Sequence, residues 1–424
     1  MLSPSSKRFP LSASPFAPLR LSQPDESAIV NIANDLLVTT LVDYDMLHLR
    51  DGGVMPPAKW KVVKRFDNLV GYQKRRHRRK ADKDQSPRLV WLGTLEGSLS
   101  DVMYGVINQN DKEGQTKAAY TKSNVVDFKV LASIVTATTS NPFKGLQIKW
   151  AVSASGLGLK RLVRLRDFVF LEATGVTRRA SGESVGYHLI HSLSIPAIRH
   201  LPDYNLVRGS ISLLHLFRET PSNTVELYTK ESLDLMGNLR SRLGLYAACK
   251  TMEVVARLPL CFQHKKLAWM LRTSHRASPK KSNDYSSCHF CQKELRRMRH
   301  CQICADNVCS KCCRFTTLRF VDPYTCRLES RKMLFCTSCT SKSKHANSAL
   351  IQVDELSQAT WTVFTETQST TSLSSERSRP PSGGTWSYAF VEVHWRTSIS
   401  SSNPSRDSFQ GLDLDVAASV SSLT

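Results

Sequence analysis

The feature that most constrains this chain is a set of four Cys-x-x-Cys pairs within residues 288–339. Such a turn places two sulfurs on one side, ready to occupy two corners of a tetrahedral zinc ion at about 2.3 Å. Four pairs satisfy two ions, and sites with four cysteine ligands leave no open coordination position, so structural zinc is expected. A segment this short needs metal binding to fold. The predicted ligands are Cys288, Cys291, Cys301, Cys304, Cys309, Cys312, Cys336 and Cys339.

The rest of the sequence supports metal ligation over disulfide bonding. Residues 1–24 lack the apolar run of a secretory signal, and no stretch approaches the ~18 to 20 apolar residues of a membrane span. We therefore expect a cytosolic, reducing location, where paired cysteines are metal ligands first. Of the 12 cysteines, ten lie between Cys288 and Cys339, and none precedes Cys249, which a disulfide framework would not explain.

A formal net charge of +22 predicts an anionic partner, which on charge alone is nucleic acid, acidic lipid or acidic protein. Two segments concentrate the charge. Residues 276–344 hold 15 Lys+Arg against 5 Asp+Glu, and residues 59–84 hold 11 against 3. The cysteine-rich segment is therefore itself strongly basic.

The first two thirds of the chain alternate between helical and strand-like patterns. Apolar residues at three- and four-residue steps predict a helix over residues 25–50, with Ser27 as its cap. Short β-branched and aromatic runs, separated by Gly, Pro, Ser or Asn clusters, then predict an antiparallel meander. A shorter helix is expected over 98–109, and a long amphipathic helix over 233–258 closes the block.

This order resembles the START-like, helix-grip type of lipid-transfer domain over roughly residues 25–265. The pieces that carry the resemblance are the runs at 60–64, 166–170 and 207–209, together with the closing helix. The resemblance implies a hydrophobic cavity between sheet and closing helix that holds one lipid or other apolar molecule. The expected fold class is therefore α+β.

The cysteine spacing is similar to that of the FYVE zinc finger, which binds phosphatidylinositol 3-phosphate on endosomes. Both share gaps of two, two, four and two residues and a long interval before the last pair. The resemblance implies a cross-braced topology in which the first and third pairs hold one zinc ion and the second and fourth hold the other. It leaves Cys249, Cys261, Cys313 and Cys326 without a ligand role.

The FYVE lipid site is a basic stretch around the third cysteine, joined by an Arg before the seventh. Here Arg297 and His300 match that stretch, whereas Met298, Arg299 and Gln302 depart from it, and Leu334 occupies the position of the Arg. The predicted phosphoinositide-binding residues are Arg296, Arg297, Arg299, His300, Arg331 and Lys332. A solvated basic face is the alternative interpretation.

Three other interpretations compete with this one. The cross-brace also supports RING fingers, which act in ubiquitin transfer or protein interaction, but four residues rather than two or three separate Cys304 from the fifth ligand. Nucleic-acid binding by the basic run at 74–80 is disfavoured because no aromatic residues interleave with it. No convincing catalytic set was found, and His188 and His191 are interpreted as sheet residues.

The sequence thus predicts a non-enzymatic, cytosolic adaptor that contacts anionic membrane, with endosomes as the implied location. Its expected parts are an extended lead-in (1–24), a START-like domain (25–265), a linker (266–284), a two-zinc FYVE-type finger (285–343) and a tail (344–424). The tail is expected to be mostly disordered, because it is rich in Ser and Thr. Its partners would be anionic lipid, an apolar ligand and, in the alternative, a protein.

Overall fold

The computed structural model describes residues 9–75, 88–154, 164–179, 181–237, 241–274, 287–294, 299–322 and 327–358. No helix within these ranges combines the length and the apolar character that crossing a bilayer requires. Arg296 and Arg297, most of the basic run at 74–80, and residues 359–424 of the predicted tail lie outside the described residues.

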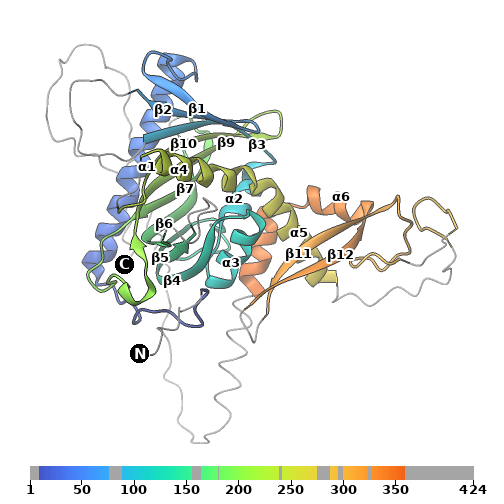
Figure 1. The fold of residues 1–424 in the computed structure, drawn as a ribbon. Coiled ribbons are helices and arrows are strands. Elements are labelled where there is room, and N and C mark those ends of the chain that lie inside the picture. The colour runs from blue at the N-terminus through green and yellow to red at the C-terminus, as the bar shows by residue number, and fades with distance from the viewer. Residues whose placement is uncertain are drawn as a thin grey trace, which may run out of the picture.

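A twisted sheet of ten described strands forms the centre of the molecule (Figure 1). Its order is β1-β2-β3-β10-β9-β7-β6-β5-β4, and these neighbours are antiparallel, while β8 adds a short parallel pairing to β6. The bounds are β1 Trp60–Phe66, β2 Leu69–Lys74, β3 Arg88–Glu96, β4 Val125–Val135, β5 Gly145–Ser153, β6 Arg166–Arg178, β7 Ser184–Ser192, β8 Val207–Arg208, β9 Ser210–Glu219 and β10 Thr224–Asp234.

The predicted α+β class with a large antiparallel sheet is confirmed, but the simple meander is wrong. Strand β3 pairs with β10, and the next strand in sequence, β4, lies at the far edge. The chain crosses between them through α2 (Leu99–Val106) and α3 (Asp111–Tyr120), of which α3 was not expected from the sequence. Alternation of apolar and polar residues identifies a strand but not the strand with which it pairs, because the alternation within a strand has the same period whichever neighbour it has.

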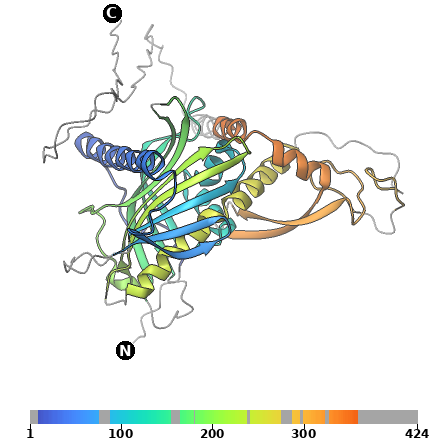
Figure 2. The same ribbon diagram turned by 90° about the horizontal axis from the view of Figure 1, so that it is seen from above.

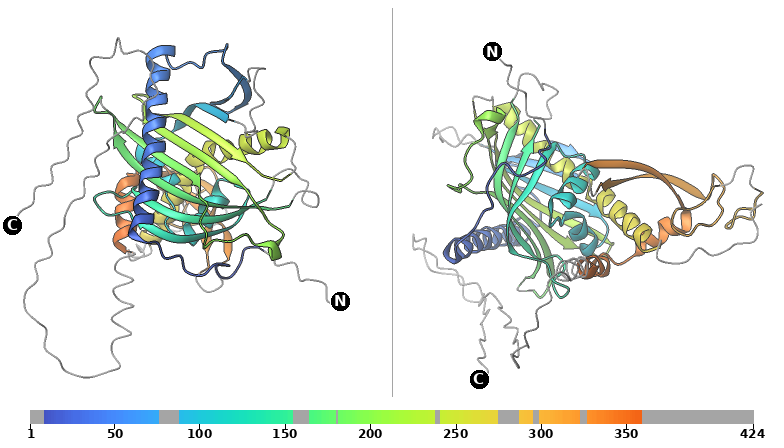
Figure 3. Two further views of the ribbon diagram at one scale, coloured as in Figure 1. Left: turned by 90° about the vertical axis from the view of Figure 1, so that its left-hand side faces the viewer. Right: turned by 90° about the horizontal axis from the view of Figure 1, so that it is seen from below.

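Helix α1 (Gln23–Asp51) covers one face of the sheet, as the left view of Figure 3 shows. It begins at a capping box in which Ser22 and Asp25 bond each other's backbone N–H groups, so the cap is Ser22 and not Ser27. It ends at Gly52, whose φ of 59° favours glycine. Residues 9–21 run across the same face, where Phe9 and Phe16 contact Trp150.

The opposite, concave face carries α2, α3, α4 (Ser241–Ala256) and α5 (Leu258–Ser274), as Figure 2 shows. The single closing helix expected over 233–258 is therefore wrong. Residues 233–234 still belong to β10, and the helical part is divided at Arg257. Pro259 accounts for the division, because proline lacks the N–H that a continuous helix needs and is favoured in a first turn.

The cysteine-rich segment forms a hairpin of β11 (Cys313–Val321) and β12 (Leu328–Cys336), followed by α6 (Thr337–His345). It projects from the sheet domain but packs on α5 (Figures 1 and 2). A short 3₁₀ helix, η1 (Pro202–Tyr204), lies between β7 and β8.

Two expected boundaries differ from the structure. Residues 266–274 of the predicted linker are helical because α5 continues through them, with Leu267, Ala268 and Leu271 buried against the hairpin. Residues 348–358, at the start of the predicted tail, also form a helix. Ile351 of that helix is buried in the core beside the concave face. Both segments were predicted to be irregular from their polar composition. They are helical because a few apolar side chains on each are buried against the rest of the protein.

Candidate functional site

Two places that the sequence implied are present in the described structure: a cavity inside the sheet domain and two clusters of thiols in the finger. The cavity has a volume of about 260 Å³ and lies between the concave face of the sheet, α3 and α4. Its walls are mostly apolar and include Phe168, Phe170, Ile190, Leu213, Val254 and Leu258.

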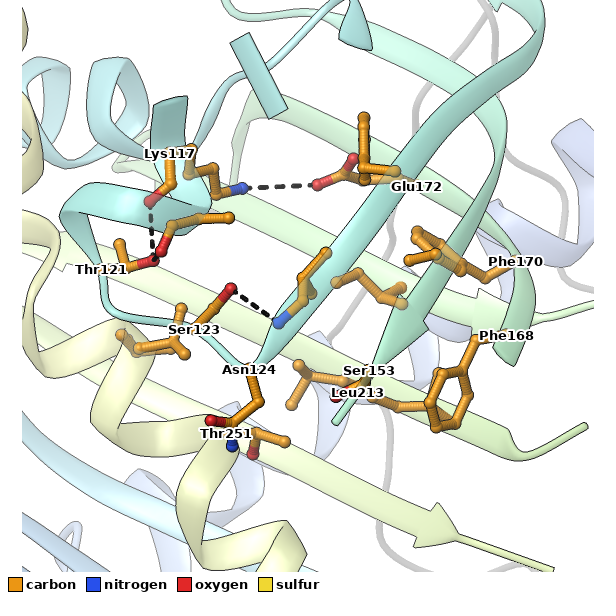
Figure 4. A pocket seen from close by; sticks show the side chains of 18 of the residues that line it. Lys117, Thr121, Ser123, Asn124, Ser153, Phe168, Phe170, Glu172, Leu213 and Thr251 are labelled. Atoms are coloured by element: carbon orange, nitrogen blue, oxygen red, sulfur yellow. Dashed lines mark hydrogen bonds and ion pairs between the residues drawn. The ribbon is translucent and has the colours of Figure 1, made fainter. Parts of the chain in front are cut away.

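One end of the cavity is polar, as Figure 4 shows where Lys117 faces Glu172. Glu172 on β6 is paired with Lys149 on β5, and its other oxygen lies 2.6 Å from His188 Nε2. Lys117 Nζ is 3.6 Å from the same carboxylate, and Asn108 donates to it at 3.3 Å. Buried charge is costly unless it is paired. This network therefore places a small set of fully partnered polar groups at the end of an apolar chamber.

The protonation of this end follows from its burial and its charges. Burial alone would raise the pKa of Glu172, but Lys149, Lys117 and the hydrogen bond of His188 hold that pKa well below its usual range. Burial, reinforced by Lys117, lowers the pKa of His188. Burial also lowers the pKa of His215, which bonds Thr229 at 2.7 Å. Two neutral imidazoles and a carboxylate thus face the chamber at neutral pH, a set suited to a hydroxyl or carbonyl group.

The other end of the cavity lies near Ser123, Asn124, Ser153 and Thr251 (Figure 4). Thr251 belongs to α4, and its Oγ1 lies 2.5 Å from Glu231 Oε1 on β10. Glu231 also accepts a hydrogen bond from Trp91 Nε1 at 3.1 Å. Helix α4 is therefore attached to the sheet by a polar contact as well as by apolar packing.

The sequence interpretation missed the polar end of the cavity. His188 was assigned to the sheet, which is correct, but its contact with Glu172 was not expected. A signal was available in β5 and β6, because Lys149 and Glu172 are charged residues within the mostly apolar, buried runs 146–152 and 168–173. A charge within a continuously buried strand indicates a buried partner.

The thiols of the finger form two groups of four, Cys288, Cys291, Cys309 and Cys312, and Cys301, Cys304, Cys336 and Cys339. Within each group the sulfur atoms lie within 4.8 Å of one another. The sulfur atoms of Cys291 and Cys309 are 3.7 Å apart, and those of Cys304 and Cys336 are 3.9 Å apart. Tetrahedral coordination at about 2.3 Å requires sulfurs about 3.8 Å apart, so each group fits one zinc ion.

The grouping follows the cross-braced arrangement implied by the FYVE resemblance, since first and third pairs share one group and second and fourth share the other. Backbone N–H groups also point at the sulfurs, with Cys309 N 3.4 Å from Cys288 Sγ and Cys336 N 3.3 Å from Cys301 Sγ. Burial would raise the pKa of Cys288, but N–H groups of Cys291, Cys309 and Phe290 lower it to about 6. The thiolate form of Cys288, which is the form that binds zinc, is thereby favoured.

Among the predicted lipid-binding residues that the structure describes, Arg331 and Lys332 lie on different faces of the hairpin. Arg331 and Lys332 are consecutive on β12 and so point to opposite faces of the hairpin. Arg331 stacks over Phe320 on the face packed toward α5 and pairs with Glu329 at 2.8 Å, whereas Lys332 lies over the exposed Phe315 on the outer face. Arg299 and the exposed His300 precede Cys301 and pair with the segment 307–308. Leu334, at the expected Arg position, is buried.

Comparison with known proteins gives likeness in shape only. No family model matches the chain, and no curated protein matches it in sequence. A solved structure of human StAR-related lipid transfer protein 5 aligns with 57% of this chain and 99% of its own, at 16% identity and a TM-score of 0.42. The human StarD13 lipid transfer and protein localization domain aligns with 48% of this chain and 88% of its own, at 17% identity and a TM-score of 0.36.

A STAR-related lipid transfer protein fragment from Xanthomonas axonopodis aligns with 48% of this chain and 99% of its own, at 12% identity and a TM-score of 0.36. The cavity and the thiol groups are therefore interpreted from their own residues. The FYVE assignment of the finger stays a prediction.

Proposed function

We propose that this chain is a non-enzymatic lipid-binding protein whose cavity takes an amphipathic molecule with one polar end. The observation that carries the proposal is the apolar chamber between the concave face and α4, ended by the network around Glu172. Ligand sites are typically apolar clefts with a few fixed polar groups, commonly of about 300 to 1,000 Å³. The chamber of about 260 Å³ is small on that scale and suits a compact ligand or a single chain.

The polar end also indicates what the ligand presents. Glu172 is already saturated by two ammonium groups, an amide and an imidazole. Lys149 already directs its three donors to Asn108 and Glu172, and Lys117 is shared between the carbonyl oxygen of Val106 and Glu172, so a phosphate would find no free cation there. A hydroxyl or carbonyl needs only one hydrogen bond, which Nε2 of His215 can make because Nδ1 of that ring bonds Thr229. The proposed ligand is therefore an uncharged lipid with one oxygen-bearing end.

The finger would bring this cavity to a membrane. Two structural zinc ions would fix its loops, and its outer face presents Lys332 beside Phe315, which is 55% exposed. An exposed aromatic ring with a neighbouring cation suits the interface of an anionic bilayer. Arg299 and His300 would add to a phosphoinositide contact if the FYVE resemblance holds in function as well as in spacing.

The cavity is tested by loading the full-length protein with a lipid mixture, repurifying it and measuring bound lipid by mass spectrometry. Val254→Trp fills the cavity from α4, and Val176→Trp, at a valine that is 46% exposed on β6, is the matched control. We expect bound lipid to fall about fivefold or more in the first variant and to stay unchanged in the second. Absence of bound lipid in the folded wild-type protein would refute the proposal.

The membrane contact is tested separately by flotation of the same protein with vesicles. Vesicles of neutral phosphatidylcholine, of mixed acidic phospholipid, and of phosphatidylcholine with phosphatidylinositol 3-phosphate separate general charge attraction from head-group recognition. Lys332→Ala should weaken flotation with both acidic compositions, because each basic residue near an anionic surface contributes about 1 kcal/mol. Equal flotation with all three compositions would contradict charge-driven contact, and no flotation with any of them would contradict the proposed membrane role and favour a protein partner for the finger.

A further inference from the structure

A second, larger cleft lies on the other face of the sheet. It has a volume of about 660 Å³ and is bounded by the second half of α1, the segment 55–60 and the outer face of β2, β3, β7, β9 and β10. Separate clusters of buried residues occupy the two faces of the sheet, so this cleft is distinct from the cavity under α4. The left view of Figure 3 shows α1 crossing the outer face obliquely, with β1 and β2 beyond it.

The floor of the cleft is apolar. Val90, Leu189, Leu214 and Tyr228 project from four strands and are buried. The walls add Leu36, Met46, Leu47 and Met55 from α1 and the following segment. At one end stands Trp60, whose side chain is only partly covered. A volume in the usual range of ligand sites, with a hydrocarbon floor, suits an apolar chain.

The rim of the cleft is basic. Its lining side chains include Arg50, Lys59, Lys74, Arg88 and Lys230 but only two carboxylates that face it, Asp43 and Asp51. A third acidic residue of this wall, Glu231, directs its carboxyl group to the opposite face, toward Trp91 and Thr251. Asp43 is already paired with Lys230 across the cleft. The remaining charge is therefore predominantly positive.

Two of these cations lie at the Trp60 end. Lys74 is the cross-strand partner of Trp60 in the β1–β2 ladder, and Arg75 N donates to Lys59 O at 2.8 Å, so Lys59 and Lys74 belong to neighbouring backbone positions. Both side chains are exposed. An indole beside two ammonium groups presents apolar contact area and positive charge at the same point.

We propose that this cleft binds an amphiphile with one apolar chain and an anionic head, a carboxylate or a phosphate monoester. The chain lies on the floor formed by Val90, Leu189 and Leu214, and the head lies between Lys59 and Lys74. Such a ligand differs in charge from the uncharged lipid proposed for the cavity under α4. The site therefore stands independently of that proposal.

The experiment uses the full-length protein and three photoreactive probes that share one diazirine-bearing chain: a fatty acid, a lysophosphatidate and a fatty alcohol. Cross-linked peptides are mapped by mass spectrometry. Lys59→Glu with Lys74→Glu reverses the charge of the rim, and Thr39→Trp fills the cleft from α1. Lys61→Glu with Lys64→Glu makes the same charge change on β1 at residues that do not line the cleft. Circular dichroism checks that each variant is folded.

We expect one or both anionic probes to label peptides of α1, β9 and β10 on the outer face. That labelling should fall about tenfold or more in the rim double variant and in Thr39→Trp, and it should persist in the control variant. Preference for the fatty acid or for the lysophosphatidate identifies the head group. Equal labelling by the alcohol, labelling confined to the cavity under α4, or no labelling of the outer face would each overturn the proposal. Loss of labelling in Val254→Trp alone would assign the ligand to the inner cavity instead.

Discussion

Glu231 is expected to make the stability of this protein fall with rising pH. Burial raises the pKa of its carboxyl group to about 8, and the hydrogen bonds from Thr251 and Trp91 only partly offset that effect. No basic side chain is paired with it among the described residues. At neutral pH the folded protein therefore holds a proton on Glu231 that the unfolded chain releases.

The hydrogen bonds around Glu231 explain how the proton is used. Thr251 Oγ1 lies 2.5 Å from Glu231 Oε1 and 2.7 Å from the carbonyl oxygen of Ala248. One hydroxyl proton can serve only one of these two acceptors. A protonated Glu231 donates to Thr251 Oγ1 and leaves the threonine hydroxyl to donate to Ala248. Ionisation removes that donor and leaves a buried charge without a cation.

The magnitude follows from linkage. A group whose pKa is raised on folding contributes stability that is fully present below the unfolded pKa and is lost as pH rises through the folded pKa. Between an unfolded value near 4.5 and a folded value of about 8, the loss is about 1.4 kcal/mol per pH unit. From about pH 5.5 to about pH 7.5 the free energy of unfolding should therefore fall by about 3 kcal/mol through this residue.

The assay is urea unfolding with zinc held constant, across this pH range, for wild type and Glu231→Gln. The glutamine stays neutral, so its free energy of unfolding lacks this slope, although one extra buried N–H costs about 1 kcal/mol. The two stability curves should cross, with wild type more stable at low pH and the variant more stable at high pH. Glu329→Gln on the exposed hairpin controls for the substitution itself. Parallel curves for wild type and Glu231→Gln would refute the reasoning.

Three further predictions concern the cavity network, the thiol groups and the hairpin. Lys149→Met should lower the free energy of unfolding, measured with urea, by about 3 to 5 kcal/mol, because the Glu172 carboxylate stays buried with one partner fewer. The double variant Lys149→Met with Glu172→Gln should regain part of the lost stability, because it removes that buried charge. Cys304→Ser should reduce bound zinc from about two ions to about one per chain by elemental analysis, while Cys313→Ser, outside both groups, should leave it unchanged. Phe335→Ala should lower the free energy of unfolding by about 3 to 5 kcal/mol, because the Phe335 ring is buried against α5. Phe315→Ala, on the exposed face of the hairpin, should change the free energy of unfolding by no more than about 0.5 kcal/mol. Equal losses of stability in urea unfolding would contradict this packing.

The sequence predicted best what depends on local pattern. The strands were found because β-branched and aromatic runs alternate with turn residues, and the helix over 25–50 because apolar residues recur along α1. The two sets of four thiols were predictable because Cys-x-x-Cys turns fix two sulfurs locally and a family resemblance supplied the pairing. The crossing from β3 to the far edge was not predictable, because α3 has no apolar face long enough to show a period.

The sequence predicted an apolar cavity between the sheet and the closing helix, but it did not predict the polar residues at the end of that cavity. Its polar end joins Lys117 on α3, Lys149 on β5, Glu172 on β6 and His188 on β7, residues that are spread over 72 positions of sequence. No motif spacing relates them, since only the sheet order brings them together. The outer cleft is harder still, because each of its rim lysines has the same appearance in the sequence as any other solvated lysine.

The linker between the two predicted domains was misplaced for a reason that also bears on function. Helix α5 has one side buried in the sheet domain through Leu258, Cys261 and Phe262 and another buried under the hairpin through Leu267, Ala268 and Leu271. Apolar residues on two faces of a helix weaken the one-sided periodicity by which a helix is predicted from sequence. The second half of α5 was therefore predicted to be a linker.

This shared helix also joins the finger to the helix that closes the cavity. Only Arg257 separates α5 from α4, and α4 supplies Val254, Val255 and Thr251 to the cavity wall. Tyr120 of α3 adds a second connection, because its hydroxyl accepts from Arg319 N of the hairpin at 2.9 Å. A displacement of the hairpin at a membrane would therefore act on α5 and α3, which border the cavity on two sides, and the finger and the cavity are best regarded as parts of one packed unit.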